Sequence, residues 1–157
     1  MRYDDSIIVY TLAIYTSISN SKKYSHLYGG IFVYNIPMFH NTKKKQIILV
    51  RHAKTVEPSN FGGMDFDRPL TESGKNSLRI VSKYLRLVGV KPDKIVSSPS
   101  KRTSETAEVL CEQYTSLKVE YIKDLYNGGS AGKRDSDSIY LNIVQKTKKD
   151  AVILVIV

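Results

Sequence analysis

An arginine and a histidine, Arg51-His52, directly follow the apolar run "IILV" at residues 47–50. An unprotonated imidazole is a nucleophile, and its ordinary pKa of about 6.5 leaves it largely unprotonated at neutral pH. An arginine guanidinium presents a planar set of N–H donors that matches phosphate oxygens. Taken alone, the pair is a weak signal, because this dipeptide often occurs by chance. For the dipeptide alone, a surface histidine in a loop is the simpler alternative.

A second basic turn, "SSPSKRTSETA" at residues 97–107, gives the pair a partner. Ser100 is expected to cap a helix whose first turn carries Arg102, and the free N–H groups of that turn favour an anion. Two adjacent parallel strands would aim Arg51 and Arg102 at one point, with His52 between them. The alternative is that Arg102 pairs with Glu105 or Glu108 on its own helix.

The chain from Gln46 onward alternates strand and helix patterns. We expect four strands, each a short apolar run, at residues 46–50, 93–98, 118–125 and 151–157. Three helical stripes lie between them, at about residues 71–89, 100–114 and 137–148. This order predicts an α/β fold with a mainly parallel central sheet covered by helices on both faces. Ligands bind such sheets beyond the carboxyl ends of the strands, where Arg51 and His52 lie.

The first helix carries signals for both of its ends. Thr71 is expected to be its N-cap, and Gly89 its stop, with Pro92 just beyond. Gly74 is expected to allow close packing of the helix. Its apolar stripe is formed by Leu78, Val81, Leu85 and Val88.

Composition places the chain in the class of ordinary globular domains. Its 157 residues suffice for one domain and carry 24 basic and 15 acidic residues, a net charge of +9. The basic residues are dispersed and carry no recognised nucleic-acid motif, so we interpret them as solvated charge and expect no nucleic-acid partner. The sequence has no apolar run of about 20 residues, which is the length that would indicate a membrane span. Cys111 is the single cysteine, which fits a reducing compartment and a cytoplasmic location.

Three segments together resemble the histidine phosphatase superfamily, whose fold is like that of phosphoglycerate mutase. They are "LVRHAKT" at 49–55, "DFDRPLTESGKNSL" at 65–78 and "SSPSKRTSETAEVL" at 97–110. The chain looks closest to the short SixA-type phosphohistidine phosphatases, over residues 46–157. The resemblance implies a three-layer α/β/α fold and a phosphatase that needs neither metal nor cofactor.

The resemblance also implies roles for named residues. His52 would attack phosphorus and carry a covalent phosphoryl group, while Arg51 and Arg102 would hold the phosphate oxygens. Proximity to the strand ends adds Lys54 and Ser98 as phosphate-binding candidates. Arg68 either faces the pocket or pairs with Asp65 or Asp67. The substrate would be a phosphorylated protein, as a phosphohistidine, or a small phosphorylated metabolite.

Two features of the family pattern are missing from the sequence. A second essential histidine, in a Gly-His motif after the fourth strand, is expected beyond Val157, and no histidine follows His52. The stretch after the third strand, "DLYNGG", offers Asp124 as its nearest carboxyl, and the lack of a clear general acid favours phosphohistidine over alkyl phosphates.

We therefore expect residues 46–157 to be a histidine phosphatase-like domain without its C-terminal part, leaving "AVILVIV" as an exposed sheet edge. Residues 1–45 are an extension to which we assign no fold, and Met38 would be a natural start. The alternative function is an inactive truncated fragment with at most weak phosphate binding.

Overall fold

A computed structural model of the chain describes residues 8–12, 26–28, 31–33, 45–127, 136–148 and 150–157. The principal strands are β1 (Ile8–Leu12), β4 (Gln46–Val50), β5 (Lys94–Ser97), β6 (Val119–Tyr121) and β7 (Val152–Ile156). Two short strands, β2 (His26–Tyr28) and β3 (Ile31–Val33), form a separate antiparallel pair. The helices are α1 (Glu72–Leu87), α2 (Lys101–Cys111), α3 (Asp124–Asn127) and α4 (Ser136–Gln145). Two 3₁₀ turns, η1 (Pro58–Asn60) and η2 (Asp65–Asp67), lie between β4 and α1.

The central sheet has the order β1-β4-β7-β5-β6, and every neighbouring pair is parallel. The four predicted strands from Gln46 onward are confirmed, with β6 shorter than expected. A fifth strand, β1, comes from the segment to which the sequence assigned no fold and pairs with β4 from Ile8 opposite Gln46 to Leu12 opposite Val50. The α/β fold with a parallel sheet is thus confirmed.

The run "AVILVIV" does not form the exposed edge that the sequence analysis expected. β7 lies between β4 and β5 and pairs with both, so its ladder groups are used on both sides. The expectation rested on the missing C-terminal part of the family pattern, and it was wrong because the described strands β4 and β5 already cover both edges of β7. A strand so placed is buried on both faces, which explains its continuous apolar sequence.

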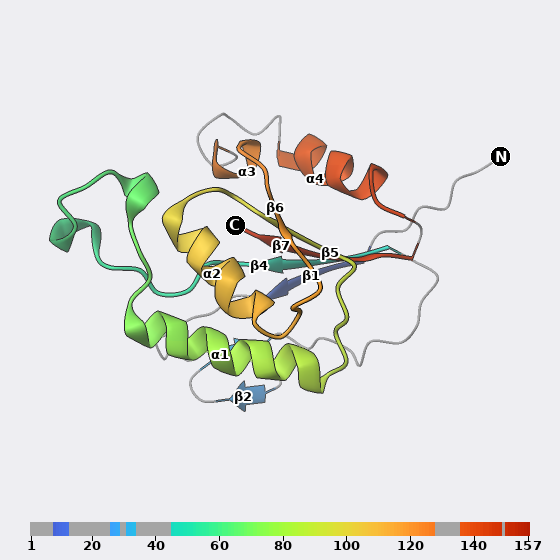
Figure 1. Cartoon of the computed structure of the whole chain (residues 1–157), viewed down its shortest axis with the longest axis horizontal. Helices are drawn as coiled ribbons and strands as arrows, with labels where there is room; N and C mark the ends of the chain where they lie inside the picture. Colours follow the sequence, from blue (N-terminus) through green and yellow to red (C-terminus); the bar gives the residue numbers. More distant parts are fainter. Residues whose placement is uncertain (1–7, 13–25, 29–30, 34–44, 128–135, 149) are drawn as a thin grey trace.

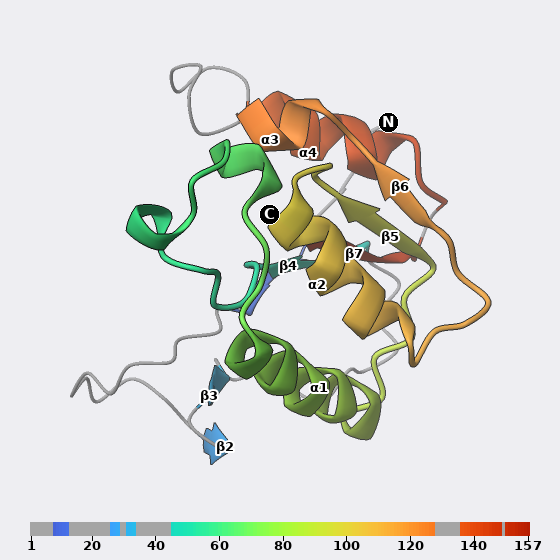
Figure 2. The same cartoon turned by 60° about the vertical axis from the view of Figure 1, so that its left-hand side comes forward.

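Helices cover both faces of the sheet (Figures 1 and 2). Successive side chains of a strand point to opposite faces, and the core divides accordingly. Ile48, Leu154 and Ile156 pack in one apolar cluster with Leu78 of α1 and Leu110 of α2. On the other face, the neighbouring strand residues join residues of α3 and α4 in a second cluster: Ile47, Val96, Ile153, Val155, Leu125, Ile143 and Val144. Within the described ranges, no helix combines the length and apolar character needed to cross a bilayer.

The predicted ends and stripe of α1 are confirmed. The Thr71 hydroxyl caps the helix by accepting from the Gly74 N–H at 3.0 Å. Gly89 ends the helix in the left-handed region, with φ at 80°, a conformation that favours glycine. Leu78, Val81 and Leu85 are buried, as their helical spacing predicted.

The segment after β4 folds back against the start of α1. The Thr71 N–H donates to the Lys54 carbonyl at 2.9 Å, and Thr55 forms an antiparallel bridge with Leu70. Gly74 completes this contact, because a Cβ atom there would overlap the Lys54 carbonyl oxygen. The close packing predicted for Gly74 is therefore confirmed, and its partner is backbone, which has little room to move.

We predict that Gly74→Ala lowers the free energy of unfolding by about 1–3 kcal/mol, the usual cost of forcing extra atoms into a filled space. Alanine is otherwise the better helix former, so a loss of stability would report the clash rather than propensity. Chemical denaturation measures the effect. Gly62→Ala is the matched control, because a Cβ at Gly62 meets nothing within 4 Å. Equal stability of the two variants would contradict the argument.

Candidate active site

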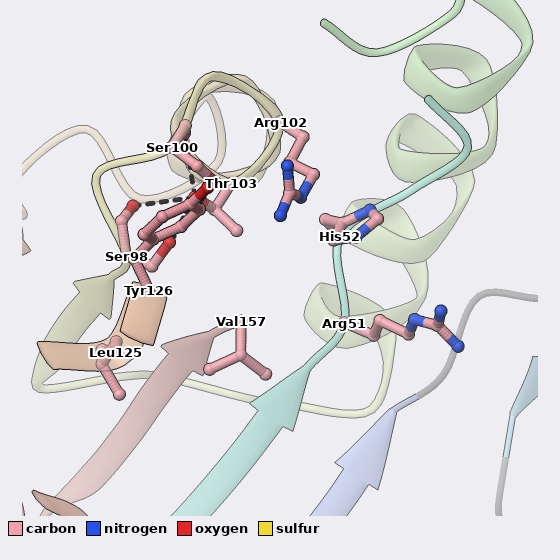
Figure 3. Close-up of a pocket in the computed structure, with 9 residues that line it drawn as sticks. All are labelled: Arg51, His52, Ser98, Ser100, Arg102, Thr103, Leu125, Tyr126 and Val157. Carbon is pink, nitrogen blue, oxygen red and sulfur yellow. Dashed lines mark hydrogen bonds between the residues drawn. The ribbon is translucent and has the colours of Figure 1, made fainter. Parts of the chain in front are cut away.

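A pocket of about 330 Å³ lies at the carboxyl ends of the central strands (Figure 3). Cationic side chains, buried hydroxyl groups and an apolar wall meet in it. The lining residues are Arg51, His52, Ser98, Ser100, Arg102, Thr103, Leu125, Tyr126 and Val157. The pocket therefore lies where parallel α/β sheets bind their ligands.

The end of β7 fixes the two segments that carry most of these residues. The His52 N–H donates to the Val157 carbonyl at 2.8 Å, and the Val157 N–H donates to the Val50 carbonyl at 3.0 Å. On the other side, the Ser98 N–H donates to the Ile156 carbonyl at 3.1 Å. Because β7 separates β4 from β5, His52 and Ser98 lie on opposite sides of the same strand end.

The imidazole of His52 is half-buried and held through one nitrogen. Its Nδ1 lies 2.8 Å from the Ala53 carbonyl oxygen, and a carbonyl only accepts, so Nδ1 carries the proton. In the neutral ring, Nε2 then keeps its lone pair. Burial lowers the pKa of His52 below its ordinary value; the hydrogen bond to the Ala53 carbonyl opposes this shift, and the cations of Arg102, Arg51 and Arg68 add to it. These effects together favour the neutral form of the ring at physiological pH.

Arg102 lies in the first turn of α2, with 15% of its side chain exposed. Its Nη1 donates to the Asp65 carbonyl at 2.8 Å and to the Asp65 Oδ2 at 2.9 Å. Its guanidinium carbon also lies 5.8 Å from the ring centre of Tyr126. Among the described ion pairs, the partner of Arg102 is thus Asp65 rather than a glutamate of its own helix. The Glu105 carboxylate instead accepts from the Leu70 N–H at 2.8 Å.

Three hydroxyl groups shape the turn before α2. The Thr103 hydroxyl lies 2.9 Å from that of Ser98 and 2.8 Å from that of Ser100, and all three residues are buried. Ser100 is the N-cap residue, as predicted, but its side chain contacts the Thr103 hydroxyl rather than a backbone N–H. This cluster fixes the backbone that carries Arg102.

The structure gathers most of the site residues that the sequence predicted. Arg51, His52, Ser98 and Arg102 all line the pocket. Figure 3 shows the Arg51 guanidinium pointing away from His52 and Arg102, so the two arginines do not converge on one point in this conformation. Lys54 lies outside the lining, with an exposed side chain. The carbonyl of Lys54 serves the cap of α1 instead.

The sequence did not predict three pocket residues that later segments contribute, namely Leu125, Tyr126 and Val157. It also did not predict that Thr103 lines the pocket or that Asp65 binds Arg102. The sequence analysis did offer an ion pair between Arg68 and Asp65 as one alternative, and the structure has that pair at 2.8 Å. The stretch "DLYNGG" was expected to follow the third strand, and nothing in its spacing indicated that Tyr126 would reach the pocket.

The family model described as histidine phosphatase superfamily (branch 1) matches residues 47–135, more than half of the chain. The chain belongs to the histidine phosphatase superfamily. The match covers Arg51-His52, the segment before α1 and the start of α2, which are the three segments on which the resemblance was based.

Curated members of the superfamily match part of this chain. The mitochondrial serine/threonine-protein phosphatase Pgam5 of Drosophila sechellia is 35% identical over 71 residues, 45% of this chain and 24% of that protein. Pgam5 of Drosophila virilis is 30% identical over 86 residues, 54% of this chain and 29% of that protein. The chain thus matches only about a quarter of the length of these relatives.

Solved histidine phosphatase structures share the fold. The SixA protein of Agrobacterium tumefaciens, described as a phosphohistidine phosphatase, has 28% identity and a TM-score of 0.58, covering 69% of this chain and 66% of that chain. A protein histidine phosphatase SixA complexed with tungstate has 23% identity and a TM-score of 0.56, covering 70% of this chain and 67% of that chain. The second likeness shows the fold alone.

We predict that His52 titrates with a midpoint below its ordinary value of 6.5, because burial and the neighbouring arginines disfavour its charged form. NMR of the imidazole nitrogens against pH measures the midpoint, and the spectrum of His52→Asn identifies the signal. Arg102→Gln should raise the midpoint, since it removes a nearby cation. Arg79→Gln, the same change on the exposed part of α1, should leave the midpoint unchanged. A midpoint at or above 6.5 in the wild type would contradict this electrostatic account.

Proposed function

We propose that this histidine phosphatase-like chain is a phosphatase that transfers a phosphoryl group to Nε2 of His52 and then to water. The observation that carries the proposal is the His52 imidazole, which donates from Nδ1 to the Ala53 carbonyl and lines one pocket with Arg102. That arrangement leaves Nε2 as the nucleophilic nitrogen and provides a cation for the phosphate oxygens.

The reaction has two displacements. In the first, the Nε2 lone pair forms a bond to phosphorus while the bond from phosphorus to the leaving oxygen or nitrogen breaks; the leaving atom keeps the electron pair and takes a proton from solvent. In the second, a water oxygen bonds to phosphorus, the P–N bond breaks and its electron pair returns to Nε2. The proton of that water goes to solvent. Splitting the reaction in this way replaces one difficult step with two easier ones.

Arg102, Arg51 and Ser98 are the proposed phosphate-binding residues. Arg102 and the free N–H groups at the start of α2 would face the non-bridging oxygens. The exposed Arg51 guanidinium would turn inward when an anion enters the pocket. Lys54 would contact the phosphate only if its exposed side chain also turned inward. Because arginines supply the positive charge, the proposed mechanism needs neither a metal nor a cofactor.

We propose that the leaving group departs without help from a side-chain carboxylic acid of the described pocket residues. None of the described residues that line the pocket has a side-chain carboxyl group. The nearby Asp65 is a poor acid, because hydrogen bonds from Arg68 above all, and from Arg102, hold its pKa below the usual range. A phosphohistidine, whose imidazole is a good leaving group, suits such a site better than an alkyl phosphate does.

The proposed substrate is therefore a phosphohistidine of a protein or a small phosphorylated metabolite with a comparable leaving group. The proposed location is the cytoplasm, on the basis of the single cysteine. The Pgam5 relatives are named mitochondrial proteins. The match covers only 24% of the first of them, so we do not transfer their location to this chain.

We predict that the chain hydrolyses p-nitrophenyl phosphate and that His52→Ala abolishes this activity, because the nucleophile is removed. Arg102→Ala should lower kcat by about 10²–10³, the usual loss when one donor to a developing oxyanion is removed. Labelling with a ³²P-phosphorylated substrate and an alkaline quench should reveal a base-stable phosphoenzyme that acid then hydrolyses, in the wild type only. Activity that survives in His52→Ala would exclude the assignment. Phosphate binding without turnover in the wild type would instead support the inactive-fragment alternative.

We predict that kcat/KM falls steeply across a series of phosphate esters as the pKa of the leaving alcohol rises. The reason is that the described residues lining the pocket include no side-chain carboxylic acid that could protonate the leaving oxygen. Steady-state rates for substituted phenyl phosphates and for glycerol phosphate measure the slope. Nearly equal rates for aryl and alkyl esters would show that some group does donate a proton.

A further inference from the structure

We infer that Asp65 is a positioning residue that holds Arg102 in place for the phosphate. The inference rests on the proposed function in one respect, namely that Arg102 binds the phosphate oxygens. Asp65 belongs to the turn η2, which lies 37 residues before Arg102 in the chain and contacts the start of α2. Nothing in the catalytic steps above uses its carboxylate.

The contact uses one end of the Arg102 guanidinium. Both hydrogen bonds to Asp65 start at Nη1, at 2.8 Å to the carbonyl and 2.9 Å to Oδ2. A guanidinium carries five N–H donors in a rigid planar fork. In the part of the chain that the structure describes, Nη1 thus fixes the plane of the group, while Nε and Nη2 can donate to an incoming anion.

Asp65 is itself fixed from the opposite side. Arg68 reaches Asp65 Oδ1 from Nε at 2.9 Å and from Nη2 at 2.8 Å. The remaining nitrogen of Arg68, Nη1, donates to the Val56 carbonyl at 3.1 Å and to the Thr55 hydroxyl. One carboxylate thus joins two arginines, with Oδ1 on Arg68 and Oδ2 on Arg102, and connects α2 to the segment that follows β4.

An aromatic contact supports the same turn at a second point. The ring of Phe66 meets the ring of Tyr126 edge to face, at 5.0 Å and 80° between planes. Tyr126 in turn lies 5.8 Å from the guanidinium carbon of Arg102. The turn η2 and the pocket wall therefore restrain Arg102 together, one through hydrogen bonds and the other through the ring.

A different role for Asp65 would be that of an internal anion that competes with phosphate for Arg102. The contacts favour positioning over competition. One of the two Nη1 bonds goes to the neutral backbone carbonyl, and Oδ1 is held by Arg68, so an anion can enter at Nε and Nη2 without displacing Asp65. The two roles predict opposite effects of removing the charge, which makes the inference testable.

The test compares Asp65→Asn with Asp67→Asn in the full chain. Asp67 lies in the same turn, is exposed and takes part in no ion pair among the described residues, so the control matches the change in charge and place. Calorimetry with inorganic phosphate, together with kcat and KM, measures the effect. Asp65→Asn should raise the phosphate Kd and KM by about tenfold, the scale of one charge-assisted hydrogen bond. Asp67→Asn should change both by less than about twofold.

A double-mutant cycle with Arg102→Ala separates positioning from a general structural effect. If Asp65 acts through Arg102, Asp65→Asn should have no further effect on phosphate binding once Arg102 is removed. An undiminished effect in that background would overturn the inference, and so would tighter phosphate binding by Asp65→Asn alone.

Binding of inorganic phosphate does not require turnover, so the two proposals can fail separately. A wild-type chain that binds phosphate without hydrolysing esters refutes the proposed function, while a weaker phosphate affinity of Asp65→Asn still supports the inference. A wild-type chain that hydrolyses esters with no change of KM in Asp65→Asn refutes the inference alone. A wild-type chain that binds no phosphate refutes both.

Discussion

The backbone pairing of β7 with a strand on each side decides which residues meet at the site. β7 lies between β4 and β5, so its end is the common backbone anchor of His52 on one side and Ser98 on the other. The hydrogen bonds of Val157 and Ile156 extend the pairing past the regular ladder and into the two segments that carry His52 and Ser98. Parallel pairing also gives all these strands the same direction, so their carboxyl ends gather at one edge of the sheet.

The site combines a cationic side with an apolar one. Arg51, His52 and Arg102 provide the first, while Leu125, Tyr126 and Val157 provide the second (Figure 3). Burial lowers the pKa of His52, and the nearby arginine cations lower it further, so the groups proposed to bind phosphate also favour the neutral imidazole that the proposed mechanism needs. Asp65 offsets part of this charge and gives two arginines a shared, fixed partner.

The fold could be predicted well where short segments carry their own signals. The strand β4 is a mainly apolar run, and α1 has both a capping threonine and a terminal glycine. The close packing expected at Gly74 is also present, against a backbone carbonyl. The strand β1 could not be predicted in the same way, because its sequence lacks a clear period and its place in the sheet depends on pairing with β4. The position of β7 inside the sheet likewise follows from pairing rather than from its composition.

The site could be predicted only in part, because some of its features are local in the chain and others depend on contacts between distant segments. By itself, the sequence determined that a histidine and an arginine follow a buried strand and that a second arginine opens a helix, because these are relations between neighbours in the chain. Only the tertiary structure decided that Asp65 is the partner of Arg102, that Tyr126 forms the wall beside it, and that the Arg51 guanidinium points outward. Such choices depend on distances between segments that are far apart in sequence, and a local pattern of residue types contains no information on those distances.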